Sequence, residues 1–142
     1  MLDTFLKGSS YSVVGPYLGL TKVSLTPAAT DTMTTLVTTN AAEFINYTVG
    51  GSAVRGTAVF ASSTSTGATP SNVTSSTATA ITYTITGAGG TVYGCFLVTG
   101  TGAVNTQSST AGTLYSEGNF SVAKAVTAGD TVSVTYSTTA TS

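Results

Sequence analysis

The side chains that most often carry out catalysis are scarce in this chain of 142 residues. It has no histidine, one cysteine, four basic residues and five acidic residues. The lack of histidine removes the commonest general base and the commonest metal ligand, so Ser-His-Asp and Cys-His arrangements are impossible. A serine nucleophile would then need a lysine base. Lys7, Lys22 and Lys124 stand in no motif that supplies one.

The acidic residues are the remaining candidates for acid–base chemistry. They lie far apart in the sequence, at Asp3, Asp31, Glu43, Glu117 and Asp130. Two of them could meet in space as the carboxyl pair of a glycoside hydrolase. We expect surface, cap and turn roles instead, with Asp31 capping a short helical turn and Asp130 completing a turn after Gly129. The residue types therefore predict that the chain is not an enzyme.

Sites for metals, cofactors and phosphates are not expected either. Calcium needs oxygen ligands at close spacing, and the acidic residues do not cluster. The glycine-rich stretch 87–90 lacks the Lys-Ser/Thr that follows a phosphate-binding loop, so it predicts a hairpin turn. Cys95 lies in an apolar segment, where a buried and unreactive thiol is expected, and one cysteine cannot form an internal disulfide. We therefore predict neither a metal nor a cofactor.

The charge content indicates which partners to expect. Only 6% of the residues are charged, the net charge is −1, and residues 56–116 carry no charge at all. Binding to nucleic-acid phosphates or to anionic membranes needs clustered Lys and Arg, so neither partner is expected. A neutral β-surface of that length is prone to aggregate unless neighbours cover it, which predicts a multimer. No run forms a signal-peptide core or a membrane span, so we expect synthesis in the cytoplasm without processing.

Alternating apolar and polar residues predict a fold made of strands. The clearest strand is 78–86, where Ile81, Tyr83 and Ile85 alternate with threonines. The stretch 91–99 is apolar on both faces, which is typical of a strand covered on both sides. Further strands are expected at 17–26, 52–60, 113–120, 122–126 and 131–137, polar loops at 62–77 and 100–112, loop and strand at 28–46, and a polar tail at 138–142. Together they predict one all-β domain, 17–142, an antiparallel β-sandwich or jelly roll.

Residues 1–16 are predicted to form an N-terminal arm, because their apolar residues follow neither a helical nor a strand period. Such an arm could bind a neighbouring molecule, or it could complete its own sandwich as an edge strand. The candidate interface residues are Leu2, Phe5, Tyr11, Val13, Val14 and Tyr17. Among the tyrosines, packing roles are expected at Tyr83, Tyr93 and Tyr136, and contact roles are open to Tyr11, Tyr17, Tyr47 and Tyr115.

Several segments resemble virion proteins of tailed bacteriophages. Residues 112–120 (Gly-Thr-Leu-Tyr-Ser-Glu-Gly-Asn-Phe) and 124–131 (Lys-Ala-Val-Thr-Ala-Gly-Asp-Thr) are similar to a strand, a turn and a second turn that precede the last strand of that group. Residues 91–96 (Thr-Val-Tyr-Gly-Cys-Phe) resemble its buried central strand, and 17–20 (Tyr-Leu-Gly-Leu) resemble its opening. The resemblance implies a structural role, either in capsid decoration or in a small tail-fibre-like protein, and it implies no catalytic residues.

We therefore expect a capsid decoration (cement) protein, a homotrimer on the outer surface of an icosahedral head, which it stabilises. Its partners would be the major capsid protein and copies of itself. The alternative is a tail or tail-fibre component whose loops contact the host surface or its glycans. A weak polysaccharide-cleaving enzyme remains a third hypothesis, because two acidic residues could converge.

Overall fold

The computed structural model describes residues 14–60, 64–65, 72–76 and 79–141. Within them, a five-stranded sheet has the order β2-β1-β8-β9, with β4 pairing on β1 beside β2, and two three-stranded sheets have the orders β10-β7-β3 and β11-β6-β5. The elements are β1 (Tyr17–Thr21), η1 (Thr35–Thr39), β2 (Glu43–Phe44), β3 (Tyr47–Thr48), β4 (Gly56–Thr57), β5 (Thr64–Ser65), β6 (Asn72–Ser76), β7 (Ile81–Ile85), β8 (Gly90–Thr99), β9 (Thr113–Val126), β10 (Thr131–Val134) and β11 (Ser137–Thr141). All pairings between these strands are antiparallel.

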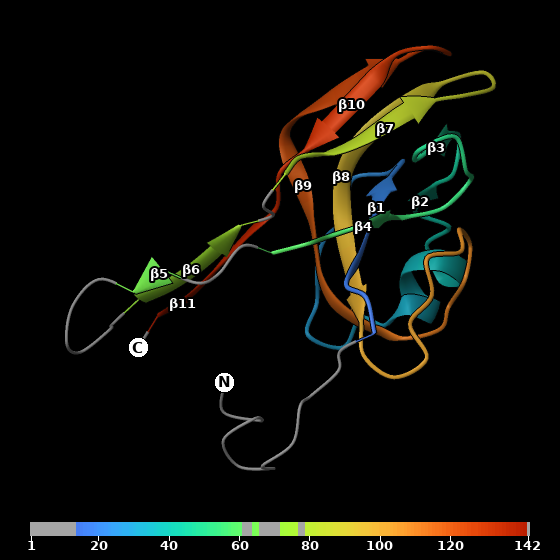
Figure 1. The fold of residues 1–142 in the computed structure, drawn as a ribbon. Coiled ribbons are helices and arrows are strands. Elements are labelled where there is room, and N and C mark those ends of the chain that lie inside the picture. Colours follow the sequence, from blue (N-terminus) through green and yellow to red (C-terminus); the bar gives the residue numbers. More distant parts are fainter. Residues whose placement is uncertain (1–13, 61–63, 66–71, 77–78, 142) are drawn as a thin grey trace.

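The first two sheets pack face to face as a β-sandwich, which confirms the predicted fold class (Figure 1). The three-stranded sheet contributes Tyr47, Tyr83 and Ile85 to the core, and the large sheet contributes Leu18, Leu20 and Val92. The hydroxyl of Tyr83 crosses between the layers and donates a hydrogen bond to the carbonyl of Leu18 at 2.8 Å. This bond lets the buried tyrosine keep a partner for its polar end.

Strand β8 lies at the centre of the large sheet and is covered on both faces, as its sequence predicted. One face packs against the other sheet of the sandwich. The opposite face, with Phe96 and Val98, packs against a second apolar cluster that includes Met33 and Leu36 from the helical segment. A strand in that position has no solvent-facing side, which explains its apolar residues on both parities.

The helical turn η1 differs from the loop and strand expected at 28–46. Threonines disfavour helices, but Met33 and Leu36 are three residues apart and both are fully buried on the sheet, so their packing outweighs the local preference. The predicted capping role of Asp31 is wrong, because its carboxylate accepts the backbone N–H of Ala28 at 2.7 Å and closes the preceding turn. The hydroxyl of Thr32 accepts the N–H of Thr35 instead.

The third sheet corrects two further predictions. The expected polar loop 62–77 contains β5 and β6, and the expected polar tail forms β11, which pairs along its whole length with β6. Figure 1 shows these strands extending away from the sandwich. Threonine and serine are compatible with strands, and the pairing joins segments distant in sequence, so local composition alone could not indicate it.

Other strand boundaries also differ from the predicted ones. The segments 113–120 and 122–126 form one strand, β9, and the strand expected at 52–60 is reduced to β4 and isolated bridges such as Val54 with Thr106. Strand β1 ends at Thr21, short of the predicted 26. The loop 100–112 is present as predicted, between β8 and β9.

Candidate functional site

A cleft with both apolar and polar lining residues lies where the two sheets of the sandwich separate. It has a volume of about 680 Å³, between β9 on one side and β10 on the other. Phe120 and Val132 are half-buried in it, and Val126 and Val134 are buried at its base, so the cleft is continuous with the main core. The lining residues are Phe120, Lys124, Ala125, Val126, Asp130, Thr131, Val132, Ser133, Val134 and Thr135.

Both strands beside the cleft are edge strands. Strand β9 ends the order of the five-stranded sheet and β10 ends the order of the three-stranded sheet. Within the residues that the structure describes, the outer backbone edge of each strand pairs with no other strand. Unpaired edge strands present N–H and C=O groups that another extended segment can bind.

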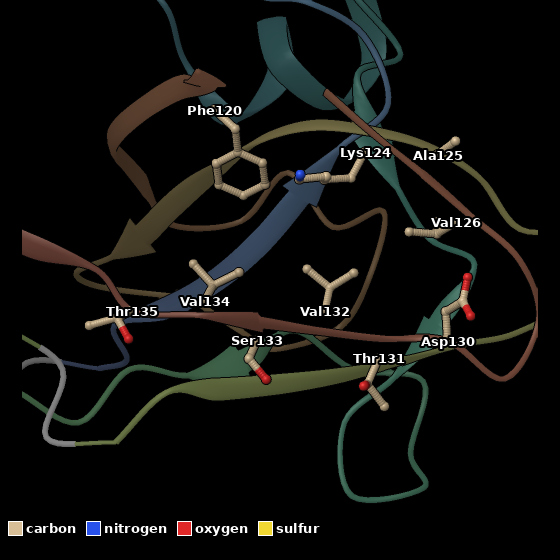
Figure 2. A pocket seen from close by; sticks show the side chains of 10 residues that line it. All are labelled: Phe120, Lys124, Ala125, Val126, Asp130, Thr131, Val132, Ser133, Val134 and Thr135. Carbon is tan, nitrogen blue, oxygen red and sulfur yellow. The ribbon is translucent and has the colours of Figure 1, made fainter. Parts of the chain in front are cut away.

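An irregularity in β9 directs Phe120 to the cleft. Val92 of β8 pairs with Lys124, and Gly94 pairs with Asn119, so four residues of β9 lie opposite Tyr93 alone. Extra residues in one strand of a pair bend that strand and reorient its side chains. In Figure 2 the ring of Phe120 and the side chains of Val132 and Val134 point toward one another across the cleft.

Lys124 supplies the one cationic group of the lining. Its side chain extends beside Phe120 in Figure 2, it is exposed, and no ion pair is formed with it in the described part of the chain. The acidic residue of the lining, Asp130, accepts hydrogen bonds from the backbone N–H and the hydroxyl of Thr127 at 2.7 and 3.0 Å. These bonds lower the pKa of Asp130 and confirm its predicted turn role.

A second feature is a pair of carboxyl groups. The sequence showed that two acidic residues could meet in space but not which ones. Asp31, before η1, and Glu117, on β9, both line a surface hollow of about 330 Å³. Burial raises the pKa of Glu117 to about 7, and the charge of Asp31 adds to the rise. A neighbouring carboxylate charge disfavours ionisation of Glu117, so Glu117 keeps its proton to a higher pH than an isolated glutamate does.

This pair bears on the hypothesis of polysaccharide cleavage. Glycoside hydrolases hold their two carboxyl groups about 5–10 Å apart, which leaves room for the sugar bond or a water molecule. Asp31 and Glu117 line the same hollow, so they are the pair of carboxyl groups on which this hypothesis depends. The side chain of Asn119 accepts a hydrogen bond from the N–H of Leu25 at 2.9 Å and donates one to its carbonyl at 2.8 Å. These two bonds join the segment before η1 to β9.

A buried ion pair is the largest feature that sequence reasoning missed. Arg55 is 1% exposed and Glu43 is 4% exposed, and they form two parallel hydrogen bonds of 2.8 Å each. The surface, cap or turn role expected for Glu43 is therefore wrong. β2 and β4 bind the same edge of β1, and this shared edge brings the two side chains together. A signal for the pair existed, since a lone Arg at the start of a long uncharged stretch needs a counter-charge if it is buried.

The ion pair also holds the loop 100–112. Glu43 accepts the N–H of Ser108 at 2.9 Å, and Arg55 donates to the carbonyl of Ser109 at 2.8 Å. The guanidinium carbon lies 5.1 Å from the ring centre of Phe96, within range of a cation–π contact. The pair therefore serves as a structural anchor for the loop.

The predicted interface residues have different outcomes. Leu2, Phe5, Tyr11 and Val13 lie outside the described residues. Val14 is 44% exposed, and its carbonyl accepts the N–H of Gly100 at 3.2 Å. Tyr17 is half-buried at the start of β1, against the second apolar cluster.

Three other tyrosines and the cysteine can also be compared with their predicted roles. The contact role open to Tyr47 is wrong, because this ring is fully buried and packs edge-on against Tyr83. Tyr83 packs in the core as expected, and Tyr115 is 57% exposed. Cys95 is half-buried beside the main core, whereas a buried thiol was expected, and burial raises the pKa of this thiol to about 11.

Comparison with known proteins adds no family assignment: no family model, no curated protein and no solved structure matches the chain. The sequence resemblance to phage virion proteins therefore stays a prediction. Among the described residues, no helix has the length and apolar character to cross a membrane, and no three acidic or cysteine side chains gather as metal ligands would.

Proposed function

We propose that this chain is a structural protein of a bacteriophage virion, which decorates and stabilises the outer surface of an icosahedral head. The observation that carries the proposal is the cleft between two open sheet edges. It offers unpaired backbone from β9 and β10 together with the apolar side chains of Phe120 and Val132. Such a surface binds another polypeptide by adding a strand and burying apolar groups.

The charge distribution supports the same function. A decoration protein binds many identical sites on a lattice and next to copies of itself, so weak mutual repulsion favours dense packing. The net charge of −1 meets that requirement. Exposed apolar side chains that do not line the cleft give further contact area, at Ile45, Val59, Val104, Tyr115 and Val122.

The proposal is tested by adding purified protein to phage heads that lack it. We expect binding at many copies per head, in proportion to the major capsid protein, and greater resistance of the heads to heat. The Lys124→Glu variant is expected to bind less well, and a Thr82→Glu variant, changed at an exposed position on β7, serves as the matched control. Binding to host cells or their polysaccharide, with no binding to heads, would contradict the proposal and favour a tail protein.

A further inference from the structure

We infer that residues 25–31 form a strap on β9 that is held in place by the neutral form of Glu117 and loosens when this side chain ionises. The inference concerns a pH-dependent motion and goes beyond the proposed function. It rests on the points at which the strap is attached, on the hollow between the strap and β9, and on the surroundings of the Glu117 carboxyl group.

Hydrogen bonds attach the strap to β9 at one end only. The side chain of Asn119 on β9 binds the N–H and the carbonyl of Leu25, at 2.9 and 2.8 Å. At the other end, Asp31 binds within the strap, since its carboxylate accepts the N–H of Ala28 and its own N–H donates to the Ala28 carbonyl at 3.0 Å. In the described part of the chain, no hydrogen bond between backbone groups joins residues 25–31 to β9. A segment with so few bonds to its neighbour can open locally while the domain stays folded.

The carboxyl group of Glu117 lies where the strap and β9 share a hollow. Glu117 lines this hollow from β9, and Pro27, Ala28 and Asp31 line it from the strap. The Oε2 atom of Glu117 is buried and has no hydrogen-bond partner among the described residues. A buried oxygen without a donor is far less costly in a neutral acid than in a carboxylate. The strap as placed therefore suits the protonated side chain.

The groups around Glu117 offer no cation to stabilise its charge. The charged or titratable groups on the elements around it are Asp31, Tyr115, Arg55 and Glu43. Arg55 lies beside the ring of Phe96, which pairs opposite Glu117 on β8, but its charge is matched by two bonds to Glu43. Neither lysine of the described chain lines the hollow. The nearest unmatched charge is thus the carboxylate of the strap itself.

The direction of the pH effect follows from these surroundings. Burial, together with the charge of Asp31, raises the pKa of Glu117 to about 7 with the strap in place, against 4.5 as its ordinary value. The attached state therefore binds the proton more tightly than the loosened state. Attachment is strongest below about pH 4.5 and is lost as the pH rises through about 7. Loosening uncovers Leu25 and Leu114, which pack in the second apolar cluster.

Amide hydrogen exchange of the full-length protein, measured by NMR at pH 5 and pH 8, tests the inference. Each rate is divided by the intrinsic rate of that amide at the same pH, which gives its protection. The N–H of Leu25 reports on the strap, and the N–H of Ala58, bonded to the carbonyl of Pro16 at 2.9 Å and buried in the main core, reports on the whole domain. We expect Leu25 to be less protected than Ala58 at both pH values, and its protection to fall by about tenfold or more from pH 5 to pH 8.

Variants assign the effect to one proton. Glu117→Gln is neutral at every pH, so its Leu25 amide should be equally protected at pH 5 and pH 8. Asp130→Asn, changed at a turn acid outside the hollow, is the matched control and should keep the pH response of the unchanged protein. Titration of the Glu117 carboxyl carbon in the unchanged protein gives a measurement that needs no variant, with a midpoint expected near 7.

Three results would overturn the inference. They are a Leu25 protection that is the same at both pH values in the unchanged protein, an equal fall in Glu117→Gln, and a carboxyl midpoint near 4.5. Protection of Leu25 equal to that of Ala58 throughout would also overturn it, because the strap would then open only when the domain unfolds. None of these measurements involves phage heads, so their failure leaves the proposed function standing.

Discussion

Replacement of Glu43 by Gln removes one charge from the buried ion pair and leaves its shape nearly unchanged. The amide can still accept one hydrogen bond from Arg55 and one from the N–H of Ser108. The guanidinium then stays buried without a counter-charge, since Arg55 is 1% exposed. Besides the amide of the new glutamine, its remaining contacts are the carbonyl of Ser109 and the ring of Phe96.

The expected loss in the free energy of unfolding is about 3–5 kcal/mol, the usual cost of leaving one charge of a buried pair unpaired. We expect the lower end, about 3 kcal/mol, because the Ser109 carbonyl and the Phe96 ring still stabilise the cation. A domain of this size has a total stability of about 5–15 kcal/mol. The midpoint of thermal unfolding should therefore fall by about 10 °C.

Urea unfolding followed by far-ultraviolet circular dichroism measures the loss, with tyrosine fluorescence as a second probe in a chain without tryptophan. The transition should shift to lower urea without a change in its slope. The matched control is the same substitution at Glu117, measured at pH 5, where an amide replaces a largely protonated acid and should cost little. Hydrogen exchange should also quicken at the amide of Ser108, which loses a charged acceptor.

A double variant distinguishes the effect of the two charges on stability from the effect of the volume that the two side chains fill. Glu43→Leu with Arg55→Met removes both charges and should lose less stability than Glu43→Gln alone, because no buried charge is left over. A loss below 1 kcal/mol in Glu43→Gln, or a double variant less stable than the single one, would show that the pair does not anchor the loop as described.

Two further predictions concern β9 and its pairing with β8. Glu117 has a pKa of about 7 in the folded protein against 4.5 as its ordinary value, so its protonated form stabilises the fold at low pH. That stability is lost as the pH rises from about 4.5 through 7, by about 1–2 kcal/mol once partial exposure is allowed for; unfolding at pH 5 and 8 measures it, and an equal pH dependence in Glu117→Gln would refute the assignment. Gly94→Ala would place a Cβ in collision with the carbonyl oxygen of Gly118, so we expect a loss of about 3 kcal/mol or more in the free energy of unfolding. Gly118→Ala is its control, since nothing lies within 4 Å of the added carbon, and equal losses in the two variants would contradict the packing.

The sequence determined those features that depend on neighbouring residues. Ile81, Tyr83 and Ile85 alternate with threonines, and they form the buried face of β7. The turn at Asp130 followed from side-chain hydrogen bonds within three residues. The two-sided apolar pattern of 91–99 predicted a strand covered on both faces. Each of these signals is a local period or a local bond, which a single sequence displays directly.

Only the tertiary structure decided which distant residues meet. Glu43 and Arg55 face each other because two short strands bind one edge of β1, and Asp31 lies at the same hollow as Glu117 because the segment before η1 packs on β9. Strands β6 and β11 have the composition of loops, and their pairing joins residues 76 and 137. The cleft exists because the two sheets end at β9 and β10 without a further strand in the described chain. Such contacts depend on strand order and register, which composition and local period do not specify.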